Sequence, residues 1–215
     1  MRTSVGELVR DVPEVSVGLH AADVLRLGEE LDALGRAGVR VIHLDVMDGI
    51  FCPQMTFGPL VVQAVGEEFV KDVHLMVHEP LTKLESYVAA GASIITFHLE
   101  STEHPHRALA SLATSGVLRG IALNPGTPVE WVEPLLDELD LVLLLAIDPG
   151  WAGQPFTPAT GRRLEAVRRL AGDRPILVGI DGAVTRENIA RVAALGSDLI
   201  VSGSAVFTGD TEAGA

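Results

Sequence analysis

The chain has 215 residues, 47% of them hydrophobic, and a mean hydropathy of +0.33, so it can bury a large core and is not a disordered protein. A net charge of −13 argues against nucleic acid as a partner, because an acidic surface repels phosphate backbones. No apolar run suits a membrane span, the N-terminus lacks a signal-peptide segment, and Cys52 is the single cysteine, so we expect a cytoplasmic protein without membrane partners or internal disulfides.

Strand-like apolar runs alternate along the chain with segments of helical spacing. The expected strands are 14–19, 40–46, 73–77, 93–98, 118–123, 140–147, 175–180 and 198–202. The expected helices are 23–36, 58–67, 80–90, 105–115, 128–138, 157–171 and 185–195. This α/β alternation predicts one (β/α)₈ TIM-barrel domain over residues 1–215. A doubly wound sheet is the alternative, but no GxGxxG follows the first strand.

The end of the chain leaves little room for an eighth helix. After Phe207 only TGDTEAGA remains, so we expect this helix to be short or missing. A truncated chain, a missing disordered tail or a covering second subunit would each account for this. We expect a homo-oligomer.

The stretch HLDVMDG, which begins at His43, places polar side chains on an apolar strand. Successive side chains of a strand point to opposite faces. If Ile42, Leu44 and Val46 face the helices, then His43, Asp45 and Met47 face the barrel interior. A buried carboxylate without a partner is costly, so Asp45 requires an explanation.

Two further strands repeat this phase. In VHLMV, His74 and Met76 point inward, and in PILVGID, Asp181 points inward at the end of its strand. Two histidines and two aspartates therefore converge near the carboxyl ends of the strands, where barrel active sites lie. Both residue types bind Zn²⁺ and similar ions, and a divalent metal would relieve the cost of burying the carboxylates. The alternative is a hydrogen-bonded polar layer, but four residues in matching phase favour the metal.

Glycine-bearing stretches follow the last three strands and indicate a phosphate site. They are IDPGWAGQPF at 147–156, IDGAV at 180–184 and VSGSAVF at 201–207. Glycines let backbone N–H groups approach an anion closely, and such barrels usually bind phosphate after strands seven and eight.

These motifs, in this order, resemble the ribulose-phosphate 3-epimerases, including the related allulose-6-phosphate 3-epimerases. The resemblance rests on HLDVMDG, VHLMV, TFHLE, LNPGTPVE, DPGWAGQPF, GIDGAV and SGSAVF, and it runs from about residue 17 to 207. It implies a (β/α)₈ barrel that binds one divalent metal ion, Zn²⁺ first, with Fe²⁺, Mn²⁺ or Co²⁺ as alternatives.

The resemblance also implies roles for individual residues. The implied metal ligands are His43, Asp45, His74 and Asp181, and the implied acid/base pair is Asp45 and Asp181. The implied substrate-binding residues are His74, Met47, Met76, Gly150, Trp151, Ala152, Gly153, Gly182, Ala183, Gly203 and Ser204.

The chemistry fits this arrangement. Inversion at C3 of a small phosphorylated ketose needs a proton removed beside the C2 carbonyl and returned on the other face, which two carboxylates can do. A cation would stabilise the enediolate charge. We expect interconversion of D-ribulose 5-phosphate and D-xylulose 5-phosphate, part of pentose phosphate metabolism. The alternative substrate is D-fructose 6-phosphate, which would give D-allulose 6-phosphate.

The first strand departs from the family. The family usually has an SxLxAD-type segment there, but this chain has VGLHAAD, with Gly18 and Ala21 where serines are usual. These small residues could leave room for an extra carbon. His20 lies between them, with a structural or a catalytic role. Ala183 stands where a second glycine is common. His98 is expected to line the pocket rim or to be structural.

Two other functions remain. A Schiff-base aldolase needs a lysine at a strand end, but Lys71 is expected before the third strand and Lys83 in a helix, which argues against it. A non-catalytic barrel that binds a sugar phosphate is the alternative from another class.

Overall fold

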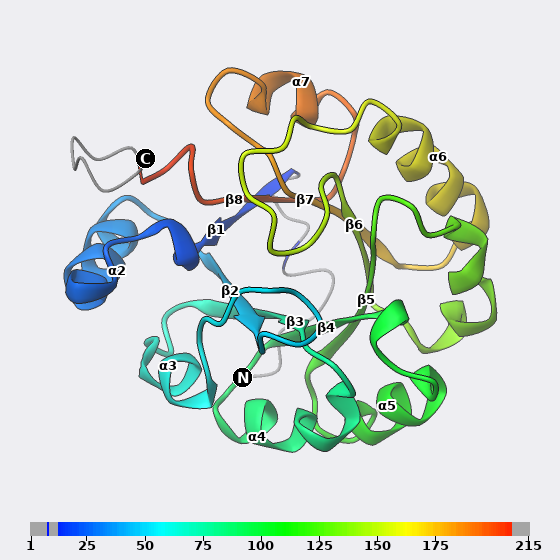
Figure 1. Ribbon diagram of the computed structural model, residues 1–215, viewed down its shortest axis with the longest axis horizontal. Coiled ribbons are helices and arrows are strands. Elements are labelled where there is room, and N and C mark those ends of the chain that lie inside the picture. The colour runs from blue at the N-terminus through cyan, green and yellow to red at the C-terminus, as the bar shows by residue number, and fades with distance from the viewer. Residues whose placement is uncertain (1–7, 9–12, 208–215) are drawn as a thin grey trace.

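The computed structural model describes residue 8 and residues 13–207. Eight parallel strands form a closed barrel in chain order, and the last strand pairs with the first (Figure 1). The strands are β1 Glu14–Gly18, β2 Val41–Met47, β3 Val70–Met76, β4 Ile94–His98, β5 Leu118–Leu123, β6 Leu141–Leu145, β7 Leu177–Asp181 and β8 Leu199–Ser202. The barrel prediction is confirmed, and closure excludes the doubly wound open sheet.

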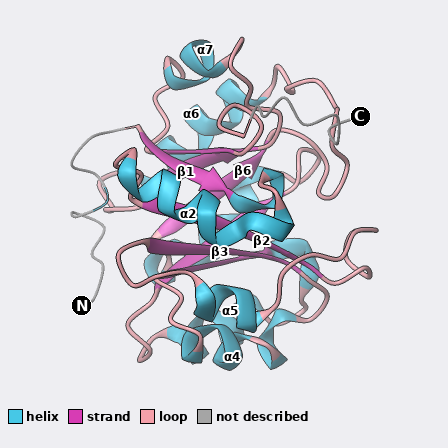
Figure 2. Cartoon of the chain, turned by 90° about the vertical axis from the view of Figure 1, so that its left-hand side faces the viewer, coloured by secondary structure: helices cyan, strands magenta, loops and turns pink. Residues whose placement is uncertain are grey.

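Helices surround the barrel and cover its outer face (Figures 1 and 2). The α-helices are α2 Leu27–Arg36, α3 Pro59–Ala64, α4 Leu84–Ala89, α5 Pro105–Leu112, α6 Thr160–Ala171 and α7 Ile189–Ala193. The 3₁₀ helices are η2 Leu19–Ala21, η3 Val24–Arg26, η4 Pro80–Thr82, η5 Leu99–Ser101 and η6 Val129–Glu138. Among the described residues, no helix has the length and apolar character needed to cross a membrane.

The two faces of the strands carry different side chains. The outward residues of β2, Ile42, Leu44 and Val46, belong to the large apolar core between the barrel and the helices. A separate apolar layer closes the amino-terminal end of the barrel interior. It consists of Leu8, Val41, Ile94, Leu118, Leu141, Leu177 and Leu199. Burying each such side chain contributes roughly 1.5–3 kcal/mol. This floor leaves the carboxyl ends of the strands as the open end of the barrel.

The third strand begins earlier than the sequence indicated. It was expected at 73–77, but β3 begins at Val70 and includes Lys71 and Asp72. Two charged residues side by side are unusual in a buried strand, which is why the pattern placed its start later. Both side chains are nonetheless buried.

The helix expected at 128–138 is the 3₁₀ helix η6. Pro134 lies inside it and has no N–H to donate, so a regular α-helical hydrogen-bond ladder cannot pass through this position.

The chain after β8 forms a turn, in which Val206 and Phe207 donate backbone hydrogen bonds to the carbonyl of Gly203. No helix follows β8 as far as Phe207. The rest of the segment in which the short or missing eighth helix was expected, 208–215, lies outside the described residues.

Candidate metal centre

Four polar side chains from three strands meet inside the open end of the barrel. His43 and Asp45 lie two residues apart on β2 and share its inward face, and Asp45 pairs in register with His74 of β3. Asp181 ends β7. One ligand atom from each residue lies within 4.8 Å of all the others. The structure therefore brings together all four residues that the sequence suggested as metal ligands.

The four side chains present complementary atoms to one space. Nε2 of His43 and Nδ1 of His74 each lie 3.2 Å from Oδ1 of Asp45. Oδ2 of Asp181 lies 3.4 Å from the same His74 nitrogen and 3.9 Å from the His43 nitrogen. Two imidazoles and two carboxylates form a donor set that suits Zn²⁺ and other first-row divalent ions. The cluster could hold a metal ion.

Burial and neighbouring charges shift the pKa values of this cluster in opposite directions. Burial lowers the pKa of His43, but the carboxylates of Asp72 and Asp45 outweigh that effect and raise the pKa well above its ordinary value. Burial raises the pKa of Asp45, but the facing His43 and hydrogen bonds from histidines bring it well below its ordinary value. Asp45 is thus an ionised carboxylate, which is the form that binds a cation.

A second carboxylate orients His43 from behind. Nδ1 of His43 lies 2.7 Å from Oδ2 of Asp72, and Ser16 donates a 2.8 Å hydrogen bond to the same oxygen. Because Nδ1–H donates to Asp72, Nε2 is the ring nitrogen directed at the centre of the cluster, where it would bind a cation on losing its proton. The sequence pattern did not single out Asp72, although its position two residues before His74 places both on the inward face of one strand.

His98 supports the other histidine of the cluster. Nε2 of His98 lies 2.9 Å from Nε2 of His74, and the two rings are stacked with centroids 4.9 Å apart. Burial lowers the pKa of His98 to about 4, so its ring is neutral near pH 7 and its Nε2 can accept a hydrogen bond from Nε2–H of His74. His98 is fully buried and does not line the pocket, so of the two roles that the sequence left open, the position at the rim is wrong and the structural role agrees with the structure.

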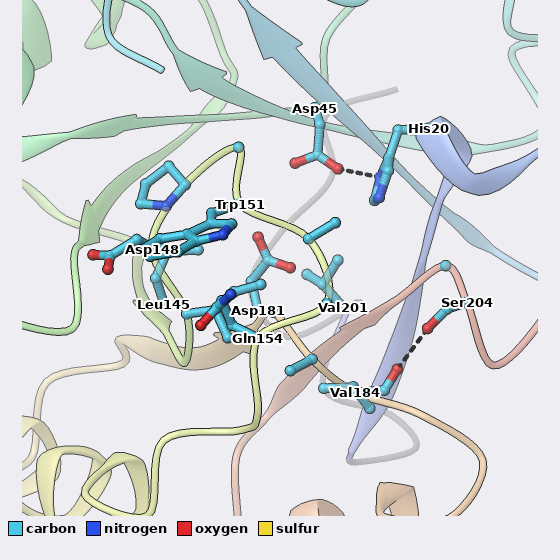
Figure 3. Close-up of a pocket in the computed structure, with 18 of the residues that line it drawn as sticks. His20, Asp45, Leu145, Asp148, Trp151, Gln154, Asp181, Val184, Val201 and Ser204 are labelled. Carbon is cyan, nitrogen blue, oxygen red and sulfur yellow. Dashed lines mark hydrogen bonds and ion pairs between the residues drawn. The ribbon is translucent and has the colours of Figure 1, made fainter. Parts of the chain in front are cut away.

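A pocket of about 480 Å³ opens beside Asp45 and Asp181. Figure 3 shows these two carboxylates approaching the same space from different strands. Ten of the eleven residues that the sequence suggested for substrate binding line it: Met47, Met76, Gly150, Trp151, Ala152, Gly153, Gly182, Ala183, Gly203 and Ser204. The exception is His74, which is fully buried and does not line the pocket.

The loops after β6, β7 and β8 form one side of the pocket through close backbone packing. A Cβ atom on Gly203 would lie 2.7 Å from the carbonyl oxygen of Gly18, so this position requires glycine. Ala183 has a φ of 53°, in the left-handed region that favours glycine. That conformation gives a physical reason for the second glycine that is common at this position in the family.

His20, whose role the sequence left open, lies in η2 and lines the pocket. Its Nδ1 atom lies 2.6 Å from Oδ2 of Asp45 (Figure 3). The loop after β2 is fixed by Asp48, which accepts backbone hydrogen bonds from Ile50, Phe51 and His78.

The chain is similar to known proteins over most of its length. A model of the Ribulose-phosphate 3 epimerase family matches residues 14–207. The ribulose-phosphate 3-epimerase of Bacillus subtilis is 39% identical over 199 residues, which cover 90% of this chain and 92% of the relative. The ribulose-phosphate 3-epimerase of Escherichia coli K12 is also 39% identical, over 198 residues that cover 90% of this chain and 88% of the relative.

Solved structures share the fold at much lower identity. A mutant tryptophan synthase alpha-subunit from Pyrococcus furiosus superimposes with a TM-score of 0.66 and 17% identity, covering 89% of this chain and 86% of that chain. At this identity the likeness supports the barrel architecture alone.

Proposed function

Because the chain belongs to the ribulose-phosphate 3-epimerase family, we propose that it is a metal-dependent ketose-phosphate 3-epimerase that interconverts D-ribulose 5-phosphate and D-xylulose 5-phosphate. It is an epimerase, an enzyme of the isomerase class. The observation that carries the finer proposal is the buried cluster of His43, Asp45, His74 and Asp181 beside a pocket of suitable size.

In the proposed reaction, Asp45 and Asp181 exchange a proton with C3 of the substrate. One carboxylate removes the C3 proton, which is acidified by the neighbouring C2 carbonyl, and the other returns a proton to the opposite face. Asp45 comes from β2 and Asp181 from β7, so the two groups can reach a bound sugar from different directions. Their roles exchange when the reaction runs in reverse.

We assign His43, Asp45, His74 and Asp181 as the residues that would hold the metal, Zn²⁺ first, with Fe²⁺, Mn²⁺ or Co²⁺ as alternatives. A divalent cation in this position would supply positive charge beside the sugar oxygens that become negative when the C3 proton leaves. Asp72 and His98 would keep the two imidazoles turned toward the ion.

The remaining pocket residues would bind the substrate. Backbone N–H groups of the loops that contain Gly182, Ala183, Gly203 and Ser204 would hold the phosphate. Met47 and Met76 would form apolar contacts beside the reacting carbons and help exclude water. Trp151 is 58% exposed on the loop after β6, where it could cover the bound sugar.

D-Allulose-6-phosphate 3-epimerase activity is the second candidate, supported by the likeness of DPGWAGQPF to the loop of those enzymes. The space beside Gly18, which could admit a sixth carbon, also borders the His20 ring, since a Cβ atom on Gly18 would lie 3.4 Å from it. This contact favours the pentulose phosphate. Comparing kcat/KM for the two sugars decides the point, and a higher value for D-fructose 6-phosphate would reverse our assignment.

Exchange of the C3 hydrogen with solvent distinguishes the enzyme from a barrel that merely binds sugar phosphates. We expect the Zn²⁺-loaded protein in D₂O to introduce deuterium at C3 of D-ribulose 5-phosphate. NMR measures this exchange as loss of the C3 proton signal. Absence of exchange across pentulose and hexulose phosphates, with each of the four metals, would reject the epimerase proposal and leave the binding function.

We also propose a homo-oligomer. Val24, Leu25 and Leu60 are apolar side chains that are more than half exposed in the single chain. Such side chains are common in subunit interfaces. Light scattering that gives the mass of one chain would exclude this assembly.

A further inference from the structure

The two carboxylate oxygens of Asp45 have different partners. Oδ1 lies 3.2 Å from the ligand nitrogens of both His43 and His74, so it belongs to the metal cluster. Oδ2 lies 2.6 Å from Nδ1 of His20 and outside the set of four ligand atoms described above. In the proposed reaction, Oδ2 is therefore the oxygen available for proton transfer with the substrate.

The His20 imidazole is held at the pocket and remains partly open to it. Its side chain is 44% exposed, whereas that of Asp45 is 4% exposed. The backbone of η2 directs His20 over the end of β1, and the ring lies close to Gly18. A Cβ atom at Gly18 would lie 3.4 Å from both Cε1 and Nδ1 of the ring, so a bulkier residue there would crowd the imidazole.

This packing links the three departures from the family pattern in VGLHAAD. Gly18 and Ala21 carry no hydroxyl. Because Gly18 has no side chain, the His20 ring can pack directly beside its backbone. The imidazole supplies a polar group at the edge of the pocket, beside a stretch that carries no hydroxyl. A histidine N–H that donates to an ionised carboxylate makes a stronger hydrogen bond than a neutral pair.

We propose that His20 is a positioning residue for Asp45, whose Nδ1–H holds Oδ2 toward the pocket for proton exchange with C3. The inference rests on the proposed epimerase function and extends it to a residue outside the four-residue cluster. Because His20 acts on the carboxylate, its removal affects the chemical step more than the binding of the substrate.

Three substitutions test which ring nitrogen matters. In His20→Leu, which removes the donor and keeps similar bulk, we expect kcat for D-ribulose 5-phosphate to fall about tenfold, the effect of losing one hydrogen bond to a charged group. KM should change less than about twofold, since the lost bond is to Asp45 and not to the substrate. His20→Asn places an amide near the Nδ1 position and should restore most of kcat, whereas His20→Gln places it near Nε2 and should not.

The matched control is His106→Leu. His106 also pairs with a carboxylate, Glu138, at 2.5 Å, but its side chain is 60% exposed on the outside of the barrel. This variant should keep the kcat of the unmodified protein. A kcat for His20→Leu equal to that of the control, or equal rescue by Asn and Gln, would overturn the proposal.

Two measurements separate failure of this proposal from failure of the epimerase function. NMR of the Zn²⁺-loaded protein with ¹⁵N-labelled histidine should show a protonated Nδ1 on His20, assigned by its loss in His20→Leu. An unprotonated Nδ1 would refute the hydrogen bond, even in a protein without epimerase activity. Zn²⁺ affinity should be unchanged in His20→Leu, and its loss would show that His20 acts through the metal instead.

Discussion

At the residue scale, the proposal depends most on the two aspartates. Asp45→Asn and Asp181→Asn keep the shape of each side chain but remove its ability to accept a proton. We expect kcat to fall by roughly 10²–10⁴-fold in each variant, the usual contribution of a general acid or base. Steady-state kinetics measures the effect, and circular dichroism checks that the barrel is retained.

Asp137→Asn is the control for these variants, because Asp137 has an 85% exposed side chain on the outside of the barrel. It should keep full activity. A full rate in Asp45→Asn or Asp181→Asn would refute the role assigned to that carboxylate.

Asp72 offers a separate test of how His43 is held. Asp72→Asn keeps the size of the side chain but removes the charge that accepts the Nδ1–H of His43. Changes in such supporting partners typically weaken metal binding by about 10–100-fold, and we expect a loss in this range. Titration with Zn²⁺ against a competing chelator measures it. An affinity equal to that of Asp137→Asn would show that Asp72 is not needed to orient the ligand.

The residues that sequence could identify are those whose chemistry follows strand alternation. His43, Asp45, His74 and Asp181 each stand out as a polar side chain in the inward phase of an apolar run. Asp72 was not identified because the adjacent charged residues Lys71 and Asp72 are typical of a loop, so the strand was predicted to begin after them. The role of His20 stayed open because a short 3₁₀ helix follows β1, so the direction of its side chain cannot be predicted from a period of two or 3.6.

At the element scale, Asp48 ties the loop after β2 to the end of β3. Burial raises the pKa of Asp48, but backbone hydrogen bonds from Phe51, Ile50 and His78 outweigh it and lower the pKa below its ordinary value. A carboxyl whose folded pKa is lowered stabilises the protein above its unfolded pKa, near 3.9, and loses that contribution as pH falls through the folded pKa.

We therefore expect Asp48→Asn to lower the free energy of unfolding by about 1 kcal/mol at pH 7, a value kept small by solvent screening at this partly exposed site. The difference from the unmodified protein should shrink below about pH 4. Urea unfolding at pH 7 and pH 3 measures both values. A deficit that stays constant over this range would show that the charge of Asp48 contributes nothing to the loop.

The turn after β7 contains a strained residue. Ala183 has a φ of 53°, a left-handed conformation that costs an L-residue roughly 1–2 kcal/mol. This strain exceeds the extra conformational entropy that a glycine would lose on folding. We expect Ala183→Gly to raise the free energy of unfolding by about 0.5–1 kcal/mol. Ala110→Gly, in the exposed part of α5, should lower it by about 1 kcal/mol. Destabilisation by both variants would contradict the strain at Ala183.

The elements themselves were largely predictable, because each strand is a short apolar run bounded by helical spacing. All eight strands lie where the runs indicated, with ends that differ by a few residues. The clearest discrepancy in type is η6, where Pro134 prevents an α-helix although the apolar spacing suits one. Apolar spacing reports which face is buried, and it does not report whether the backbone can complete its hydrogen bonds.

At the scale of the whole molecule, the closed barrel explains how distant segments form one site. Asp45 and Asp181 are far apart in sequence, yet parallel strands in a closed ring bring their carboxyl ends to the same opening. The rule that active sites lie at this opening is what allowed the cluster to be inferred from three separate motifs. The contacts among loops of different strands, such as Gly203 against Gly18, depend on backbone geometry that no local pattern contains.

The central claim is that one cation is held by His43, Asp45, His74 and Asp181. Anomalous diffraction from crystals of the Zn²⁺-loaded protein tests it most directly. We predict one peak per chain, about 2.0–2.2 Å from Nε2 of His43, Nδ1 of His74 and one oxygen of each aspartate. A peak bound elsewhere in the chain, or no peak at saturating Zn²⁺ with the four side chains in their present positions, would contradict the account.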